Sequence, residues 1–170
     1  LEGFHADPEI LYSRKTGRYY IYSTTDGTEG WGGWYFTAYS SDDLIHWTRS
    51  NVRIDKAFPD KFGNIGCAWA PEVTYDAQKG KLMIYFTMRF KNEANKLYYV
   101  YVNDDFDRIE TLPQILFEYP NEKISAIDGD ITKVGDRYRM FYVSHDGGAG
   151  IKQAVSDRIN GDYEYDPRWY

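Results

Sequence analysis

Three stretches of the chain begin alike, and this internal repeat constrains the fold more than any other feature of the sequence. They are DPEILYSRKTGRYYIYST from Asp7, APEVTYDAQKGKLMIYFT from Ala70 and DGDITKVGDRYRMFYVS from Asp128. Each has an acid two residues after its start, followed by a short apolar run, a glycine-bearing turn and a second, aromatic-rich run. Each stretch therefore predicts two antiparallel strands joined by a tight turn.

Two further strand-like runs follow each predicted hairpin. The third runs are GGWYFTAYSSDD, NKLYYVYVNDD and AGIKQAVSDR, and the fourth runs are IHWTR, DRIETL and DYEYD. Asn, Asp and Ser at the ends of the third runs favour turns through local backbone hydrogen bonds. No long window shows helical periodicity. We therefore expect an all-β fold of three four-stranded units, at about 7–55, 69–117 and 127–170.

A four-stranded unit that repeats with its own turns is typical of a β-propeller blade. A Greek-key sandwich is the alternative, but it does not explain three aligned copies. Closed propellers have typically about 4–8 blades, so three blades do not close a ring. The outer faces of the first and third blades would then expose apolar side chains. We expect the chain to be the N-terminal part of a larger propeller, or to complete itself by self-association through these exposed blade faces.

Composition narrows the class of partner. Aromatic residues make up 18% of the chain, and their flat rings are surfaces on which sugars stack. The net charge of −6 argues against nucleic acid, which needs a basic protein face. No apolar run approaches the length of a membrane span, and the single Cys67 excludes an internal disulfide. We therefore expect no role for nucleic acid or a membrane, and the net charge suits a neutral partner.

The repeat also places acidic residues at equivalent positions. Asp7 and Asp128 begin two of the units, and a second acid follows two residues later in all three, at Glu9, Glu72 and Asp130. The innermost strands of a propeller start at one mouth of the central channel, so acids far apart in sequence converge there. Crowded carboxylates raise each other's pKa. Paired carboxylates roughly 6.5–9.5 Å apart are what inverting glycoside hydrolysis needs.

The motifs HADPEI, AWAPEV and IDGDI resemble, in family order, those of glycoside hydrolase family 43. YSSDDLIHWT also resembles that family's segment after the first hairpin, so the resemblance spans essentially the whole chain. It implies a five-bladed propeller that acts on arabinose- and xylose-containing polysaccharides by inversion. Three acids are implied: a general base in blade one, a pKa-modulating Asp in blade three and a general-acid Glu in blade four.

Carried over by motif, Asp7 matches the general base and Asp128 matches the modulator. Asp130 is a rival for Asp128, because strand alternation puts both on one side; we choose Asp128 because it aligns with Asp7. Taken alone, Asp7 could also be a turn residue before Pro8. No Glu-Gly-Pro-like segment follows Asp128. Since general-acid assistance is worth about 10²–10⁴-fold, we expect little or no hydrolysis by this chain alone.

Five residues are candidates for substrate binding, each with a structural alternative: His5, Trp34, Trp69, Glu72 and His145. Trp69 could form the wall of a sugar site or pack between blades. Glu72 could bind hydroxyl groups or form an ion pair in the core. Trp31 and Trp34, in a glycine-rich loop, could form an outer platform or a cluster at the blade edge. A non-catalytic carbohydrate-binding propeller, stacking sugars on Trp69 and the 31–34 loop, is the alternative function.

The histidines carry the weakest expectations. His5 could donate a hydrogen bond near the site or be structural. Some family 43 relatives hold a metal ion, often calcium, through a histidine and waters, and His145 would be its counterpart here. We assign no metal ligands, because the acids lack EF-hand spacing, and the reaction requires no cofactor. The resemblance implies an extracellular or periplasmic location, but the sequence does not choose between arabinofuranosidase, xylosidase and arabinanase.

Overall fold

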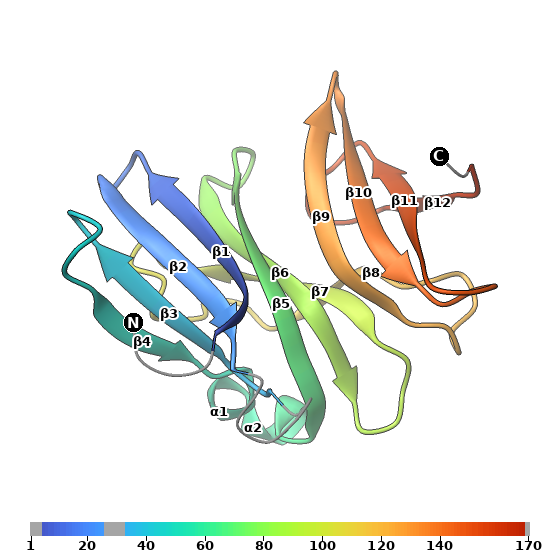
Figure 1. The fold of residues 1–170 in the computed structure, drawn as a ribbon, viewed down its shortest axis with the longest axis horizontal. Helices are drawn as coiled ribbons and strands as arrows, with labels where there is room; N and C mark the ends of the chain where they lie inside the picture. The colour runs from blue at the N-terminus through green and yellow to red at the C-terminus, as the bar shows by residue number, and fades with distance from the viewer. Residues whose placement is uncertain (1–4, 26–32, 169–170) are drawn as a thin grey trace.

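A computed structural model describes residues 5–25 and 33–168. Within them, twelve strands form three four-stranded sheets, and two one-turn helices separate the first sheet from the second (Figure 1). All the pairings are antiparallel, and in each sheet the strands follow chain order from one edge to the other. The prediction of an all-β fold built from three four-stranded units of the β-propeller type is confirmed.

The elements have the following bounds. Sheet 1 consists of β1 (Ala6–Ser13), β2 (Arg18–Thr24), β3 (Phe36–Ser41) and β4 (Thr48–Val52). Sheet 2 consists of β5 (Ile65–Asp76), β6 (Lys81–Phe90), β7 (Lys96–Val102) and β8 (Gln114–Phe117). Sheet 3 consists of β9 (Ala126–Val134), β10 (Arg137–Ser144), β11 (Gly150–Ser156) and β12 (Glu164–Asp166). The helices between sheets 1 and 2 are α1 (Ile54–Ala57) and α2 (Pro59–Phe62).

The last strand of sheet 2 lies later in the chain than the sequence predicts. DRIETL, residues 107–112, is expected as this strand, whereas β8 begins at Gln114. The side-chain oxygen of Asn103 instead accepts hydrogen bonds from the amides of Asp107 and Arg108, at 3.2 and 2.9 Å. Local bonds of this kind compete with strand ladders. The segment therefore forms a turn with an isolated bridge, and the strand starts after it.

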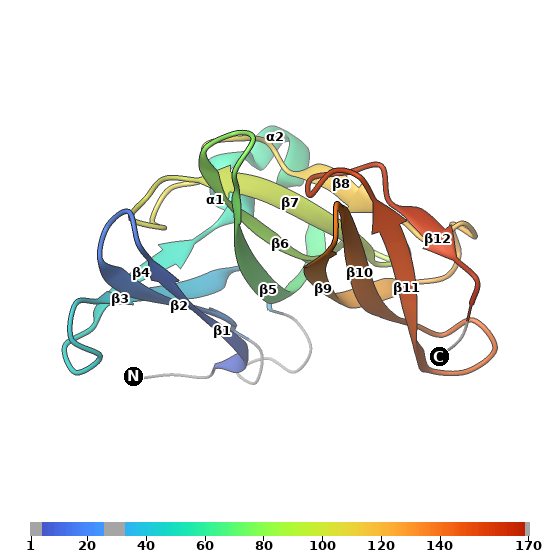
Figure 2. The same cartoon turned by 90° about the horizontal axis from the view of Figure 1, so that it is seen from above.

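The three sheets fan out along an open arc (Figure 2). The first strand of each sheet lies on the inner side of the arc, where β5 contacts both β1 and β9. The last strands, β4, β8 and β12, form the opposite edges of their sheets. The inner strand of sheet 2, β5, thereby lies between the inner strands of sheets 1 and 3.

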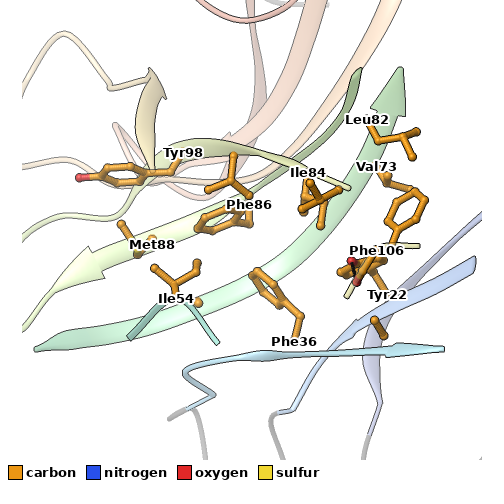
Figure 3. Packing of buried hydrophobic residues seen from close by; sticks show 14 of the residues in the cluster. Tyr22, Phe36, Ile54, Val73, Leu82, Ile84, Phe86, Met88, Tyr98 and Phe106 are labelled. Atoms are coloured by element: carbon orange, nitrogen blue, oxygen red, sulfur yellow. Dashed lines mark hydrogen bonds between the residues drawn. The ribbon is translucent and has the colours of Figure 1, made fainter. Parts of the chain in front are cut away.

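Two apolar cores hold the sheets together face to face. Aromatic and aliphatic side chains fill the space between sheets 1 and 2, among them Tyr22, Phe36, Ile84, Phe86 and Met88 (Figure 3). Successive side chains on a strand point to opposite faces, so β6 also sends Met83 and Tyr85 into the core shared with sheet 3. Sheet 2 is thus buried on both faces, which accounts for the apolar run from Leu82 to Phe86 in β6.

Phe106, in the connection between β7 and β8, fixes sheet 1 to sheet 2. Its side chain is fully buried, and its ring centroid lies 4.2 Å from that of Tyr20 and 5.3 Å from that of Tyr22. The Tyr22 hydroxyl donates a hydrogen bond to the carbonyl oxygen of Phe106. Phe106, from the β7–β8 connection of sheet 2, is therefore enclosed by the aromatic face of sheet 1.

The two helices serve as connectors. Each has four residues, and the buried side chains of Ile54 and Phe62 anchor them to the first core. Pro59 lies in the first turn of α2, where its missing amide hydrogen costs little. Over the described residues, no helix has the length and apolarity that crossing a membrane requires.

Candidate active site

Each inner strand is interrupted by a β-bulge, seen as a shift in the strand register, which lies near the start of β1 and β9 and in the middle of β5. The residues at these bulges share a left-handed backbone, with φ of 46° at Asp7, 44° at Ala70 and 54° at Asp128. Non-glycine residues rarely adopt this conformation, although Asp tolerates it better than most. Bulges re-aim side chains and are frequent beside active sites. The three repeats therefore share a backbone feature as well as a sequence motif.

Asp7 and Asp128 come close enough to interact electrostatically, although they belong to sheets 1 and 3. Partial desolvation by the surrounding protein raises the pKa of Asp128, and the negative charge of Asp7 raises it further. Both side chains remain accessible to solvent. The fold thus brings two solvent-accessible carboxylates from distant parts of the chain close enough for their charges to interact.

A second acidic group lies two residues further along each inner strand. Burial, followed by the charges of Glu9, Asp130 and Asp7, raises the pKa of Glu72 to about 7. Burial also raises the pKa of Glu9, and the charge of Asp130 adds to the effect. Glu72 is on the middle sheet and therefore has an acid on either side. Near neutral pH it holds a proton for much of the time, so it can donate a hydrogen bond to a ligand oxygen.

The bulge in β9 separates Asp128 from Asp130. Plain alternation predicts that both point to the same side, but the register shifts between the partners of Phe141 and Val143. An extra residue in the bulged strand breaks the alternation at this point. The electrostatic neighbours differ accordingly: Asp128 interacts with Asp7, whereas Asp130 interacts with Glu9 and Glu72.

Gly129, between the two aspartates, is a packing requirement of the IDGDI motif. It is buried, and a Cβ atom at this position would lie 2.6 Å from Cδ1 of Leu97 on β7. Leu97 is itself fully buried, so its side chain has little room to move. The β9 bulge is therefore pressed closely against sheet 2.

Sequence reasoning missed the hydroxyl groups that hold two of the bulges. Thr24 Oγ1 accepts a hydrogen bond from the Ala70 amide at 2.8 Å, and Thr87 Oγ1 accepts one from the Asp128 amide at 3.1 Å. In each case the threonine belongs to the preceding sheet. The available signal was the shared spacing in IYST and IYFT, where a threonine follows a tyrosine by two positions.

Trp34 and Trp69 lie beside a contact between the segment preceding β3 and strand β5. The Ala68 amide donates a hydrogen bond of 2.8 Å to the carbonyl oxygen of Gly33. Trp34 is 42% exposed, and Trp69 is partly exposed, with the Arg89 guanidinium 5.1 Å from its ring. Among the described residues, the buried indole N–H of Trp69 has no hydrogen-bond partner. The predicted platform also included Trp31, which lies outside the described residues.

His5 contacts sheet 1. Its Nδ1 lies 2.9 Å from Ser23 Oγ, its Nε2 lies 3.4 Å from Tyr39 Oη, and its ring meets that of Tyr39 edge to face. Strand alternation puts Ser23 and Tyr39 on the face of sheet 1 directed away from sheet 2. His5 therefore makes structural contacts on that outer face.

His145 directly follows β10 and is exposed. The end of β10 pairs with the start of β9, so His145 lies at the same end of sheet 3 as Asp128. Across residues 5–25 and 33–168, no three His, Cys, Asp or Glu side chains are grouped so that they could hold a metal ion.

The family model described as a probable glycosyl hydrolase domain matches residues 5–168. The chain belongs to this glycosyl hydrolase family. This family model is related to glycoside hydrolase family 43 and confirms the resemblance seen in the motifs. The fold agrees with it: a family 43 β-1,3-galactosidase superposes with a TM-score of 0.70 at 15% identity, over 96% of this chain and 32% of that chain.

Two further relatives are an arabinofuranosidase and an arabinanase. An α-L-arabinofuranosidase of Bifidobacterium longum subsp. longum is 26% identical over an alignment that covers 84% of this chain and 15% of that protein. The α-L-arabinanase of Penicillium chrysogenum complexed with arabinobiose superposes with a TM-score of 0.69 at 16% identity, over 95% of this chain and 49% of that chain. This glycosyl hydrolase chain therefore spans half or less of the length of these relatives.

The raised pKa of Glu72 makes the stability of the domain dependent on pH. The pKa of an unfolded Glu is about 4.3, below the value of about 7 in the fold. Between these values the folded state binds more protons than the unfolded state, so the free energy of unfolding falls as pH rises, and the loss is complete above the folded pKa. Glu72→Gln cannot ionise and should escape this loss.

From about pH 5 to about pH 8, the free energy of unfolding of Glu72→Gln should rise relative to that of wild type by on the order of 1 kcal/mol. The gain is smaller than the full pKa shift implies, because solvent screens part of the interaction. Urea unfolding at both pH values measures this gain. Glu122→Gln, in an exposed turn, is the matched control. Identical pH profiles for the two variants would contradict the assignment of Glu72 to the acidic group.

Proposed function

We propose that the complete protein is an inverting glycoside hydrolase that acts on arabinose- or xylose-containing plant polysaccharides or oligosaccharides. The observation that carries this proposal is the approach of Asp7 and Asp128 at two equivalent bulges. The 26% identical arabinofuranosidase favours arabinofuranosyl linkages. Xylosidase activity and xylan degradation are supported by the motif resemblance alone. Substrates of this kind also favour a location outside the cytoplasm, extracellular or periplasmic, which cell fractionation would test.

In the proposed reaction Asp7 is the general base. Its carboxylate takes a proton from a water molecule, whose oxygen attacks the anomeric carbon as the bond to the leaving oxygen breaks. The leaving oxygen takes its proton from a general acid on the other side of the sugar. Because water attacks from the face opposite the leaving group, the product has inverted configuration.

Asp128 is proposed to orient that general acid and to raise its pKa. Its own pKa is raised by desolvation and by Asp7, which is the electrostatic setting that a modulator needs. Glu72, on the middle sheet between the acids, is proposed to bind a sugar hydroxyl. Trp69 and Trp34 are proposed as stacking surfaces, and His145 as a polar contact at the same end of sheet 3.

Replacing either aspartate in the complete protein tests the proposal. Asp7→Asn and Asp128→Asn should each lower turnover of arabino-oligosaccharides by about 10²–10⁴-fold, because proton transfer or its tuning is lost, and circular dichroism should show intact folding. Asp136→Asn, on the exposed β9–β10 turn, is the control. Proton NMR of the first product should show the inverted anomer. Full activity in both site variants, or retention of configuration, would refute the mechanism.

We also propose that the 170-residue chain binds carbohydrate without hydrolysing it at a substantial rate, since it contains no Glu-Gly-Pro-like segment after Asp128. Calorimetry with arabinoxylan fragments should show heat of binding, and chromatography of the same samples should show no product. Trp69→Ala should weaken binding, whereas Trp47→Ala, on the β3–β4 turn, should not. Turnover comparable to that of active relatives would show that an acid within this chain suffices. Binding by a complete protein that also lacks turnover would favour the carbohydrate-binding module.

Self-association through the outer faces of sheets 1 and 3 is a further proposal. Ile151 on β11 is 71% exposed and faces away from sheet 2, as do the half-exposed Ile10 and Tyr12 on sheet 1. Sedimentation should show a mass that rises with protein concentration. Ile151→Lys should abolish the rise, whereas Ile45→Lys, on an exposed turn, should leave it unchanged. A monomer at every concentration would rule it out.

A further inference from the structure

The bulge that carries Asp128 is attached to sheet 2 by two side-chain hydroxyl groups. Thr87 Oγ1 accepts a hydrogen bond from the Asp128 amide at 3.1 Å, and Tyr85 Oη accepts one from the Ile131 amide at 3.0 Å. Tyr85 and Thr87 are two residues apart on β6, so both point toward sheet 3. They bond the backbone on either side of Gly129 and Asp130.

These two bonds hold the backbone of β9 where its pairing with β10 is irregular. The register shift in β9 interrupts the regular pairing with β10 around Asp128, and an amide that is partly shielded from water is costly to leave without an acceptor. Thr87 is fully buried and Tyr85 is 3% exposed, so their hydroxyls are fixed within the core. With Gly129 packed against Leu97, the bulge rests on sheet 2 at three points.

The equivalent bulge in sheet 2 is held less firmly. Thr24 Oγ1 accepts from the Ala70 amide at 2.8 Å, which matches the contact made by Thr87. Tyr22, the counterpart of Tyr85, instead donates its hydroxyl to the carbonyl oxygen of Phe106. Among residues 5–25 and 33–168, the bulge with an alanine therefore receives one such bond, and the bulge with a carboxylate receives two.

We propose that Thr87 is a positioning residue for Asp128, with Tyr85 as a second support, so that sheet 2 sets the placement of Asp128 relative to Asp7. The functional meaning of this placement rests on the role proposed above for Asp128. The geometric claim does not, because it concerns the position and environment of a carboxylate and can be measured without turnover.

Nuclear magnetic resonance of the 170-residue chain tests the proposal. Thr87→Val keeps the shape of the side chain and removes the acceptor. We expect hydrogen exchange of the Asp128 amide to accelerate by about 3- to 10-fold, the equivalent of one hydrogen bond. Carbon-13 titration should also show the pKa of Asp128 falling toward its ordinary value, because the released bulge is better hydrated and less constrained near Asp7. Thr87→Ser restores the hydroxyl and should return both readouts toward wild type.

Thr24→Val is the matched control, because it removes the same kind of bond from the bulge at Ala70. It should accelerate exchange at Ala70 and leave exchange at Asp128 unchanged. If Thr87→Val does not fold, Tyr85→Phe provides the test, with faster exchange at Ile131 and the same direction of change in the pKa of Asp128. Unchanged Asp128 readouts in a folded Thr87→Val or, failing that, a folded Tyr85→Phe variant would overturn the proposal. Equal changes at Asp128 in Thr24→Val would also overturn it.

The outcome separates this proposal from the proposed function. Faster amide exchange and a lower pKa at Asp128 in Thr87→Val, combined with full turnover by Asp128→Asn in the complete protein, would support the positioning contact and refute the catalytic role. Unchanged amide exchange and pKa at Asp128 in Thr87→Val, combined with an inactive Asp128→Asn variant of the complete protein, would support the catalytic role of Asp128 and refute its positioning by sheet 2.

Discussion

The packing of sheet 2 against both of its neighbours determines where the acidic residues lie, because none of the acids is close to its partners in sequence. Two apolar cores, one on each face of the middle sheet, fix the positions of sheets 1 and 3. Burial of this much apolar surface is the dominant favourable contribution to such an arrangement. The approach of Asp7 to Asp128 is therefore a consequence of core packing on sheet 2, supported by the hydroxyl and glycine contacts at the bulges.

The arrangement at the inner strands opposes stability in two ways. Three non-glycine residues adopt left-handed φ values, and several carboxylates share one region with raised pKa at Glu9, Glu72 and Asp128. Strain and like-charge crowding of this kind persist only where the surrounding structure fixes them, and they are concentrated at functional sites. Their coincidence at equivalent positions of the three repeats supports a site that binds or transforms a ligand, and the family to which the chain belongs makes carbohydrate the natural candidate.

Much of this could be predicted from the repeat. Equivalent motifs around Asp7, Ala70 and Asp128 predicted three four-stranded sheets and the convergence of their acids. The separation of Asp128 from Asp130 could not be predicted, because strand alternation assumes a regular ladder and β9 is bulged. The contact of Thr87 with Asp128 spans 41 residues and depends on the packing of two sheets. The predicted position of the last strand of sheet 2 was wrong, because Asn103 stabilises a turn where the sequence pattern predicted a strand.

The enclosure of Phe106 within the aromatic face of sheet 1 has a consequence for how the molecule comes apart. The side chain belongs to the β7–β8 connection of sheet 2, so sheet 1 cannot detach without exposing a fully buried ring and breaking the bond between the Tyr22 hydroxyl and the Phe106 carbonyl. We therefore expect the first two repeats to unfold as one cooperative unit, although their sequences resemble separate modules. We expect the exchange or deletion of a single repeat to destabilise such an interlocked pair, because the buried Phe106 ring would lose its partners on sheet 1.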